Sequence, residues 1–151
     1  MGLLALLAAL AGTAAYSDIR FRTIPNGLNG ATALLGLASV GLTQGGAAAA
    51  WALAHLAVAL ILGMLAFSLR LWGGGDAKFY AAVAAWFPLR QFPLLIIAIS
   101  LAGLALLIVW FAIGRIGRSH HPSEPKKELP YGVAIAAGAL VTMALAGLPQ
   151  S

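Results

Sequence analysis

The chain has 151 residues, of which 62% are hydrophobic and only 9% are charged, and its mean hydropathy is +0.95. Charged residues make up about a quarter of an ordinary soluble domain, so this composition excludes a soluble protein and predicts an all-α integral membrane protein with the lipid bilayer as its partner. The net charge of +5 is explained by the positive-inside rule and does not indicate nucleic-acid binding. Because the chain has no cysteine, disulfides, a thiol nucleophile and a cysteine-based zinc site are excluded.

Six apolar segments follow one another along the chain, separated by polar or glycine-rich stretches. We expect helices over about residues 2–16, 28–42, 47–69, 77–87, 94–113 and 131–148, all in one transmembrane domain that covers residues 1–151. No lysine or arginine precedes the first segment, which therefore favours an uncleaved helix over a signal peptide. The fourth segment is only about 16 Å long at ~1.5 Å per residue, which is less than the hydrocarbon core of about 30 Å.

The basic residues are distributed unevenly over the loops between these helices. With six spans, both termini lie on one side of the membrane, and the loops around Asp18, around Asp76 and over residues 114–130 lie on the other. All but one of the nine lysines and arginines fall in those three loops, namely Arg20, Arg22, Arg70, Lys78, Arg115, Arg118, Lys126 and Lys127. The positive-inside rule then predicts a multi-pass protein of the inner (plasma) membrane, with both termini outside and the aspartates on the cytoplasmic face.

Two aspartates stand at the edges of apolar segments in a chain that has only four acidic residues. Asp18 ends the first expected helix, and the polar stretch after it contains Asn26, which can cap the second helix. Asp76 follows three glycines, in the stretch Gly73-Gly74-Gly75-Asp76-Ala77-Lys78. Glycine permits backbone conformations that other residues resist and lets another backbone approach closely. An acid next to hydrocarbon is a functional-site candidate, so we expect the fold to bring Asp18 to Asp76.

Two carboxyl groups held a few ångströms apart share one proton, because they cannot both ionise easily. Such a pair suits amide hydrolysis: the ionised member takes a proton from water while the protonated member polarises the scissile carbonyl. No metal and no cofactor are needed for this chemistry. The competing interpretation is structural, with Asp18 paired to Arg20 or Arg22 and Asp76 paired to Lys78.

The residues of the two motifs resemble those of the type IV prepilin peptidase family of intramembrane aspartic endopeptidases. The resemblance is carried by Asp18 with the later Ile24-Pro25-Asn26, and by Gly73-Gly74-Gly75-Asp76-Ala77-Lys78, which is similar to the family's Gly-x-Gly-Asp-x-Lys. Pro130-Tyr131-Gly132 is similar to a Pro-aromatic-Gly in relatives, and the length is most like the short members that serve tad/Flp-type pili (CpaA or TadV). The resemblance implies catalysis by Asp18 and Asp76, a substrate-binding or site-shaping role for Gly73, Gly74, Gly75 and Lys78, and the same for Asn26 if it does not act as a cap.

The implied substrates are prepilins or pseudopilins, each with a short basic leader, a glycine before the cut and an apolar helix. Larger members of the family carry a cysteine-bearing segment and also methylate the new N-terminus. This chain has no cysteine, so we expect proteolysis without methyltransferase activity. Two alternatives remain: a small proton-coupled transporter, or a protease of the presenilin or signal peptide peptidase type, which sets its first aspartate within a helix. His120 and His121 are a further metal-site candidate in the 114–130 loop. The oligomeric state and the roles of Lys78 and of this loop are left open by the sequence.

Overall fold

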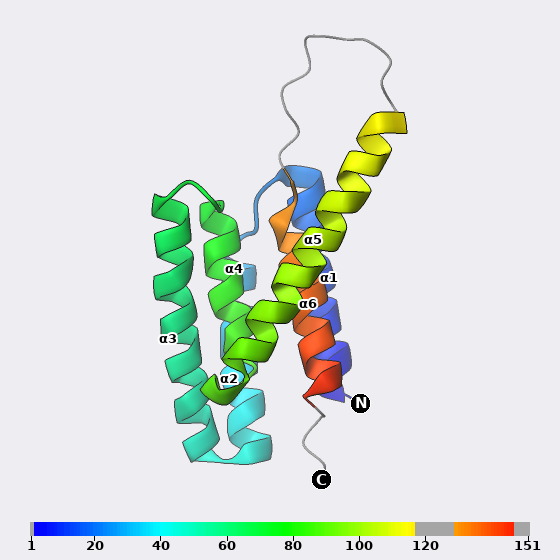
Figure 1. Ribbon diagram of the computed structural model, residues 1–151. Helices are drawn as coiled ribbons and strands as arrows, with labels where there is room; N and C mark the ends of the chain where they lie inside the picture. The colour runs from blue at the N-terminus through cyan, green and yellow to red at the C-terminus, as the bar shows by residue number, and fades with distance from the viewer. Residues whose placement is uncertain (1, 117–128, 147–151) are drawn as a thin grey trace.

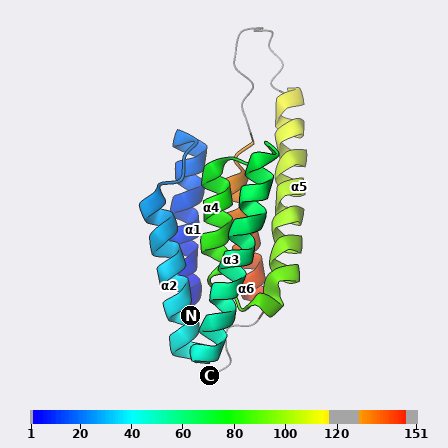
Figure 2. The ribbon, with the colours of Figure 1, turned by 90° about the vertical axis from the view of Figure 1, so that its left-hand side faces the viewer.

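The computed structural model describes residues 2–116 and 129–146, with the side chains of residues 113–116 left out. Within these ranges the secondary structure is entirely helical, which confirms the predicted all-α class. The elements are α1 (Gly2–Phe21), α2 (Asn26–Gln44), α3 (Gly46–Ser68), α4 (Gly74–Ala84), the short 3-10 helix η1 (Leu89–Gln91), α5 (Phe92–Ile116) and α6 (Tyr131–Leu145). The six α-helices alternate in direction, so α1 begins and α6 ends at the same end of the bundle (Figures 1 and 2).

Helix α4 lies at the centre of this arrangement, packed against α2, α3 and α6, while α5 packs on α6 at the outside (Figure 2). Every residue from Phe79 to Ala84 is buried. Close packing is possible because neighbouring helices present small residues: a Cβ atom added to Gly63 of α3 would lie 3.0 Å from the backbone oxygen of Ala77. A helix that is apolar on all sides is a buried helix, and α4 is shielded by the longer helices around it.

Three helical segments are long and apolar enough to cross a membrane: α1, α3, and Leu89–Ala112, which joins η1 to most of α5. The outward faces of α3 and α5 carry large exposed hydrophobic side chains, among them Leu53, Ile61, Leu65, Leu101, Leu104 and Ile108. These surfaces are stable only in lipid, so the chain is a membrane protein. Helix α4 has 11 residues and α6 has 15, and the number of spans stays a prediction.

The expected helix boundaries are wrong at the two ends that carry the aspartates. Helix α1 continues to Phe21, so Asp18 lies inside the helix and not at the start of a loop. The last turn is closed by Arg22, which has a positive φ of 55° and donates its backbone N–H to the carbonyl oxygen of Asp18 at 3.0 Å. Helix α4 begins at Gly74, three residues earlier than expected, and ends at Ala84. Residues 88–93, which lie between the expected helices 77–87 and 94–113, are largely helical, with Pro93 tolerated in the first turn of α5.

The expected 114–130 loop falls mostly on residues 117–128, outside the described residues, together with His120 and His121. Its beginning is helical, because α5 continues to Ile116.

Candidate active site

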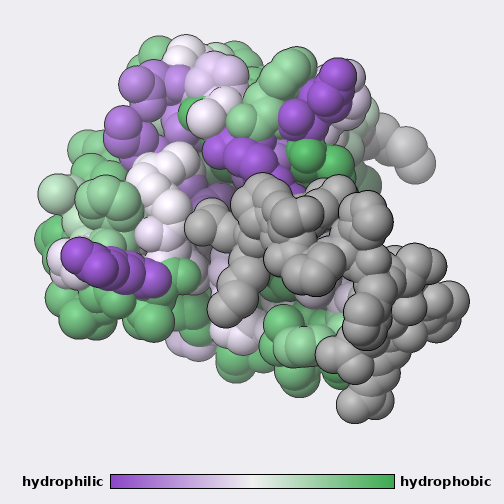
Figure 3. Space-filling view, turned by 90° about the horizontal axis from the view of Figure 1, so that it is seen from above, coloured by the Kyte–Doolittle hydropathy of each residue, from purple (hydrophilic) through white to green (hydrophobic). Residues whose placement is uncertain are grey.

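Asp18 and Asp76 come from different helices to the same end of the bundle, opposite the end where the chain begins. Asp18 lies in the last turn of α1 and Asp76 in the first turn of α4. Figure 3 looks onto this end and shows hydrophilic side chains gathered between hydrophobic ones at the periphery. Both aspartates line one cavity of about 800 Å³, together with Arg22, Phe67, Ser68, Arg70, Leu71, Trp72, Gly73, Leu129 and Tyr131. The structure therefore brings the two acids together, as the sequence predicts.

Asp18 belongs to the face of α1 that packs inside the bundle. The buried residues of this helix are Leu7, Ala11, Ala14 and Asp18, which recur every three or four positions. Asp18 is buried, with 7% of the residue exposed, and its Oδ2 accepts a hydrogen bond of 2.9 Å from the backbone N–H of Gly132, in the first turn of α6. This bond satisfies one of the free N–H groups at the start of α6.

Asp76 occupies the third position of α4 and reaches back to the residue before the helix. Its Oδ2 accepts the backbone N–H of Gly73 at 3.3 Å, an arrangement that stabilises a helix N-terminus. Asp76 lies outside the three segments that are long and apolar enough to cross a membrane. Its pKa is raised from the ordinary 3.8 to about 6, first by burial and second by the negative charge of Asp18, while the N–H groups of Gly73 and Gly132 act against the rise. The two carboxyl groups are thus electrostatically coupled.

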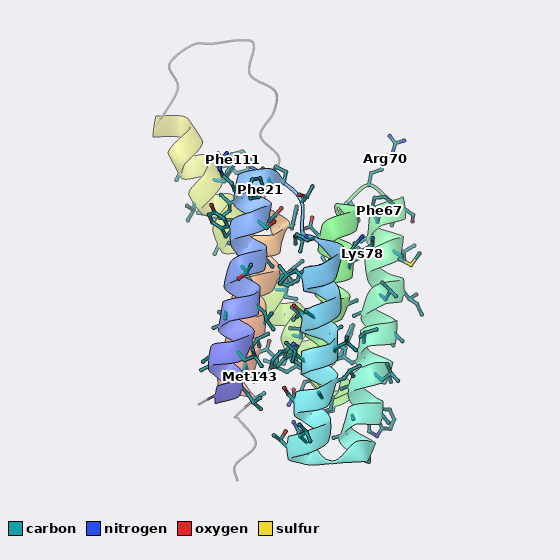
Figure 4. All side chains as sticks on the ribbon, turned by 180° about the vertical axis from the view of Figure 1, so that it is seen from behind. Phe21, Phe67, Arg70, Lys78, Phe111 and Met143 are labelled. Atoms are coloured by element: carbon teal, nitrogen blue, oxygen red, sulfur yellow. The ribbon has the colours of Figure 1, made fainter. Side chains whose placement is uncertain are left out.

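The glycines beside Asp76 do not adopt the unusual backbone conformations that the sequence suggests. Among the described glycines only Gly45 has a positive φ, and Gly73 has an ordinary φ of −72°. The left-handed positions near the cavity are arginines instead, Arg22 and Arg70 (φ 57°). Arg70 stands beyond the end of α3 and points away from the helical body (Figure 4).

The absence of glycine side chains instead leaves free space around the carboxylate. A Cβ atom added to Gly73 would lie 3.0 Å from Oδ2 of Asp76, whereas those at Gly74 and Gly75 would make ordinary contacts of 3.5 Å. Gly73, Gly74 and Gly75 line a second cavity of about 340 Å³, which also contains both aspartates.

Lys78 and Asn26 contact one another across two helices. The Nζ of Lys78 donates to Oδ1 of Asn26 at 3.0 Å, which ties α4 to the start of α2 (Figure 4). The expected capping role of Asn26 is wrong: Pro25 occupies the N-cap of α2 and no side chain caps it. The contact with Asn26 also replaces the alternative in which Lys78 pairs with Asp76. Of the two arginines considered as partners for Asp18, Arg20 lies 5.7 Å from the ring centre of Phe21, and Arg22 lines the cavity.

The sequence reasoning assigned no role to several residues that the fold brings to the cavity. Tyr131 of α6, Leu129 just before it and Trp72 before α4 line the cavity, and Gly132 contacts Asp18 beside it. The feature of the sequence that could have indicated these residues is Pro130-Tyr131-Gly132 at the beginning of an apolar segment. No group of three residues with metal-ligating side chains exists among the described residues.

Comparison with known proteins gives one positive result. The sequence model of a family described as the type IV leader peptidase family matches residues 5–108, which is more than two thirds of the chain and includes both aspartates. No curated protein and no solved structure matches the chain.

Proposed function

Since the chain belongs to the type IV leader peptidase family, we propose that it is an aspartic endopeptidase that removes the leader peptide from type IV prepilins or pseudopilins. The observation that carries this proposal is the meeting of Asp18 and Asp76 at one cavity of about 800 Å³. Family membership accounts for peptidase activity on leader-bearing pilin precursors and for the membrane setting. The aspartic mechanism, the site residues and the membrane side are parts of the proposal.

In the proposed mechanism the two carboxyl groups act as acid and base on one water molecule. Asp76 holds the shared proton, in keeping with its pKa of about 6, and donates it to the carbonyl oxygen of the scissile peptide. Asp18 takes a proton from the water while the water oxygen bonds to the carbonyl carbon, which gives a tetrahedral diol. The C–N bond then breaks as Asp18 returns a proton to the leaving amine and Asp76 recovers its own from the diol. Neither a covalent enzyme intermediate nor a cofactor takes part.

The position of the cavity suits a substrate that stays in the membrane. It lies where α1 and α3 end, and both helices are long enough to cross the bilayer. A pilin precursor whose apolar helix is embedded beside the bundle would present its leader junction at this level. We propose six membrane spans, with the cavity on the cytoplasmic face of the inner membrane, where basic leaders are retained. We further propose that the chain belongs to the short, tad/Flp-type branch of the family.

Among the alternatives, only the presenilin type gains an observation from the structure. The position of Asp18 within α1 removes one difference between the chain and that class of protease. The family match over residues 5–108 favours the leader peptidase, and the Pro-Ala-Leu element of presenilin-type proteases is absent from the sequence.

The test is cleavage of a full-length candidate prepilin by the purified chain in lipid nanodiscs, read as a size shift on a gel and by mass spectrometry. We expect a cut after the glycine at the end of the leader. With S-adenosylmethionine added, the new N-terminus should remain unmethylated. Intact precursor with every tad/Flp-type and other type IV prepilin tried would refute the peptidase proposal, and an added methyl group would refute the restriction to proteolysis.

A further inference from the structure

We propose that Gly132 is a positioning residue for the reaction: its backbone N–H orients the carboxylate of Asp18, and its missing side chain leaves the space that this carboxylate occupies. The inference rests on the proposed catalytic role of Asp18. It concerns α6, which lies outside the residues that the family model matches.

The first support is the contact itself. The donor and acceptor are 114 positions apart in the chain and 2.9 Å apart in space, and the bond is buried. Hydrogen bonds from a backbone amide to a carboxylate are stronger than those between neutral groups. The N–H group belongs to the first turn of a 15-residue helix, so its direction is fixed by the backbone and does not depend on a side-chain rotamer. The bond engages Oδ2 of Asp18, and among the described residues Oδ1 has no protein donor.

The second support is steric and independent of the bond. A Cβ atom at position 132 would lie 2.8 Å from Oδ2, 3.0 Å from Cβ and 3.1 Å from Cγ of Asp18. Comfortable contacts between carbon atoms begin at about 3.5 Å. Any residue other than glycine would therefore push the Asp18 side chain away from α6. A glycine is needed here for close approach, because its φ lies outside the positive range.

The surroundings of Asp18 explain why its orientation has to be imposed. Arg22, directly after α1, lines the same cavity as Asp18, as do Asp76 of α4 and Tyr131 of α6. Arg70 also lines it, but its side chain points away from the bundle (Figure 4). Arg22 is exposed, and its positive charge attracts the carboxylate of Asp18 toward the guanidinium group. The Gly132 N–H holds it instead against α6. A displacement of about 1 Å at a catalytic group lowers turnover by as much as about a hundredfold.

The experiment compares three glycine-to-alanine variants of the full chain in nanodiscs. Gly132→Ala tests the proposal. Gly138→Ala controls for damaged packing in the same helix, because its Cβ would meet Ile99 at 2.5 Å, far from the aspartates along α6. Gly103→Ala controls for the substitution itself, because its nearest neighbour, Ala134, is at an ordinary 3.8 Å. Each variant is assayed for kcat, KM and the pH dependence of kcat/KM, per folded molecule.

We expect Gly132→Ala to lower kcat by about a hundredfold with little change in KM. The acidic limb of kcat/KM should move to higher pH, because the ionised form of Asp18 loses a donor. Gly138→Ala should unfold at lower temperature and keep the wild-type pH profile, and Gly103→Ala should match the wild type. Wild-type kcat and pH profile in Gly132→Ala would overturn the proposal, as would an equal loss of kcat in Gly138→Ala.

Two further measurements keep this proposal separate from the proposed function. If the wild-type chain cleaves no prepilin, pH-difference infrared spectra of the carboxyl groups still report the contact, with Asp18→Asn assigning the band. The Asp18 band should titrate differently in Gly132→Ala; an unchanged band refutes the contact.

If Gly132→Ala does not fold, the double variant Gly132→Ala with Asp18→Gly, which removes every Asp18 atom that the new methyl group would meet, should be as stable as Asp18→Gly alone. A double variant less stable than Asp18→Gly would show that the new methyl group does not act through Asp18.

Discussion

The two aspartates have the same side chain but different surroundings, and this difference determines what each can do. Asp18 is fixed by a buried N–H bond from a distant helix, at 2.9 Å. Asp76 accepts a longer, local bond of 3.3 Å from Gly73, and its pKa is raised to about 6. A carboxyl group that keeps its proton close to neutrality can act as the acid. One whose ionised form accepts a hydrogen bond is the first of the pair to lose its proton, and it is then in the form that can act as the base.

Residues that act as one unit lose activity non-additively. We therefore expect Asp18→Asn and Asp76→Asn each to lower kcat by about 10³-fold or more, and the double variant to be no worse than either. Asparagine is nearly isosteric with aspartate but cannot exchange the proton, so all three variants should still insert and bind prepilin. Cleavage assays on purified protein, with co-purification of the prepilin as the folding control, check this. A slowly active Asp18→Asn next to an inactive Asp76→Asn would reduce Asp18 to a structural residue.

The raised pKa of Asp76 predicts how activity depends on pH. The raised value means that the protonated form persists up to about pH 6, and the mechanism requires that proton. The kcat/KM of the free enzyme should therefore fall as the pH rises through about 6, about tenfold per pH unit once Asp76 is ionised. Initial rates at low prepilin concentration measure this limb, and circular dichroism at each pH excludes unfolding. A constant kcat/KM between about pH 5 and about pH 8 would contradict the assignment of the proton to Asp76.

At the scale of the helices, local chemistry explains what the sequence predicts and what it misses. The order of the six helices follows from the apolar segments, and the site follows from two acids next to apolar segments. The sequence does not predict the last turn of α1 because Asp18 and Arg20 interrupt the apolar run there, although Arg22 closes that turn by adopting a positive φ. The bond between Gly132 and Asp18 joins residues 114 positions apart, and no local pattern encodes it.

Contacts between helices depend on glycine at positions where two backbones meet. A Cβ atom at Gly36 of α2 would lie 2.6 Å from Trp86, whose indole N–H donates to the carbonyl oxygen of Thr32 at 3.0 Å. We expect Gly36→Ala to lower the free energy of unfolding by about 1–3 kcal/mol, measured by thermal or denaturant unfolding in detergent. Gly30→Ala is the matched control in the same helix, because no atom lies within 4 Å of its added Cβ. It should be neutral or slightly stabilising, and equal effects at both positions would contradict the packing argument.

At the scale of the whole molecule, the distribution of charges and the position of the cavity predict an orientation in the membrane. The cavity end carries Arg22 and Arg70, whereas Arg90 lies beside a groove at the opposite end, near Gln44 and Trp51. Only one of the nine basic residues falls in the loops expected on that opposite side. By the positive-inside rule, this asymmetry predicts that the cavity end faces the cytoplasm. The proposed substrates fit the orientation that we propose, because a basic leader would be retained in the cytoplasm until it is cut.

Two cysteine variants at the ends of α3 test this orientation in a chain that has no cysteine of its own. Helix α3 has 23 residues, or about 34 Å at ~1.5 Å per residue, which is enough to cross a hydrocarbon core of about 30 Å. Gln44 and Ser68 are both exposed and flank it. In spheroplasts, Gln44→Cys should react with an impermeant maleimide, and Ser68→Cys only after permeabilisation. Ser68 also lines the cavity, so the side on which its cysteine reacts is the side of the aspartates. Labelling of Ser68→Cys from outside would place the cavity on the outer face of the membrane. The proposal that leaders are cut on the cytoplasmic face would then have to be abandoned.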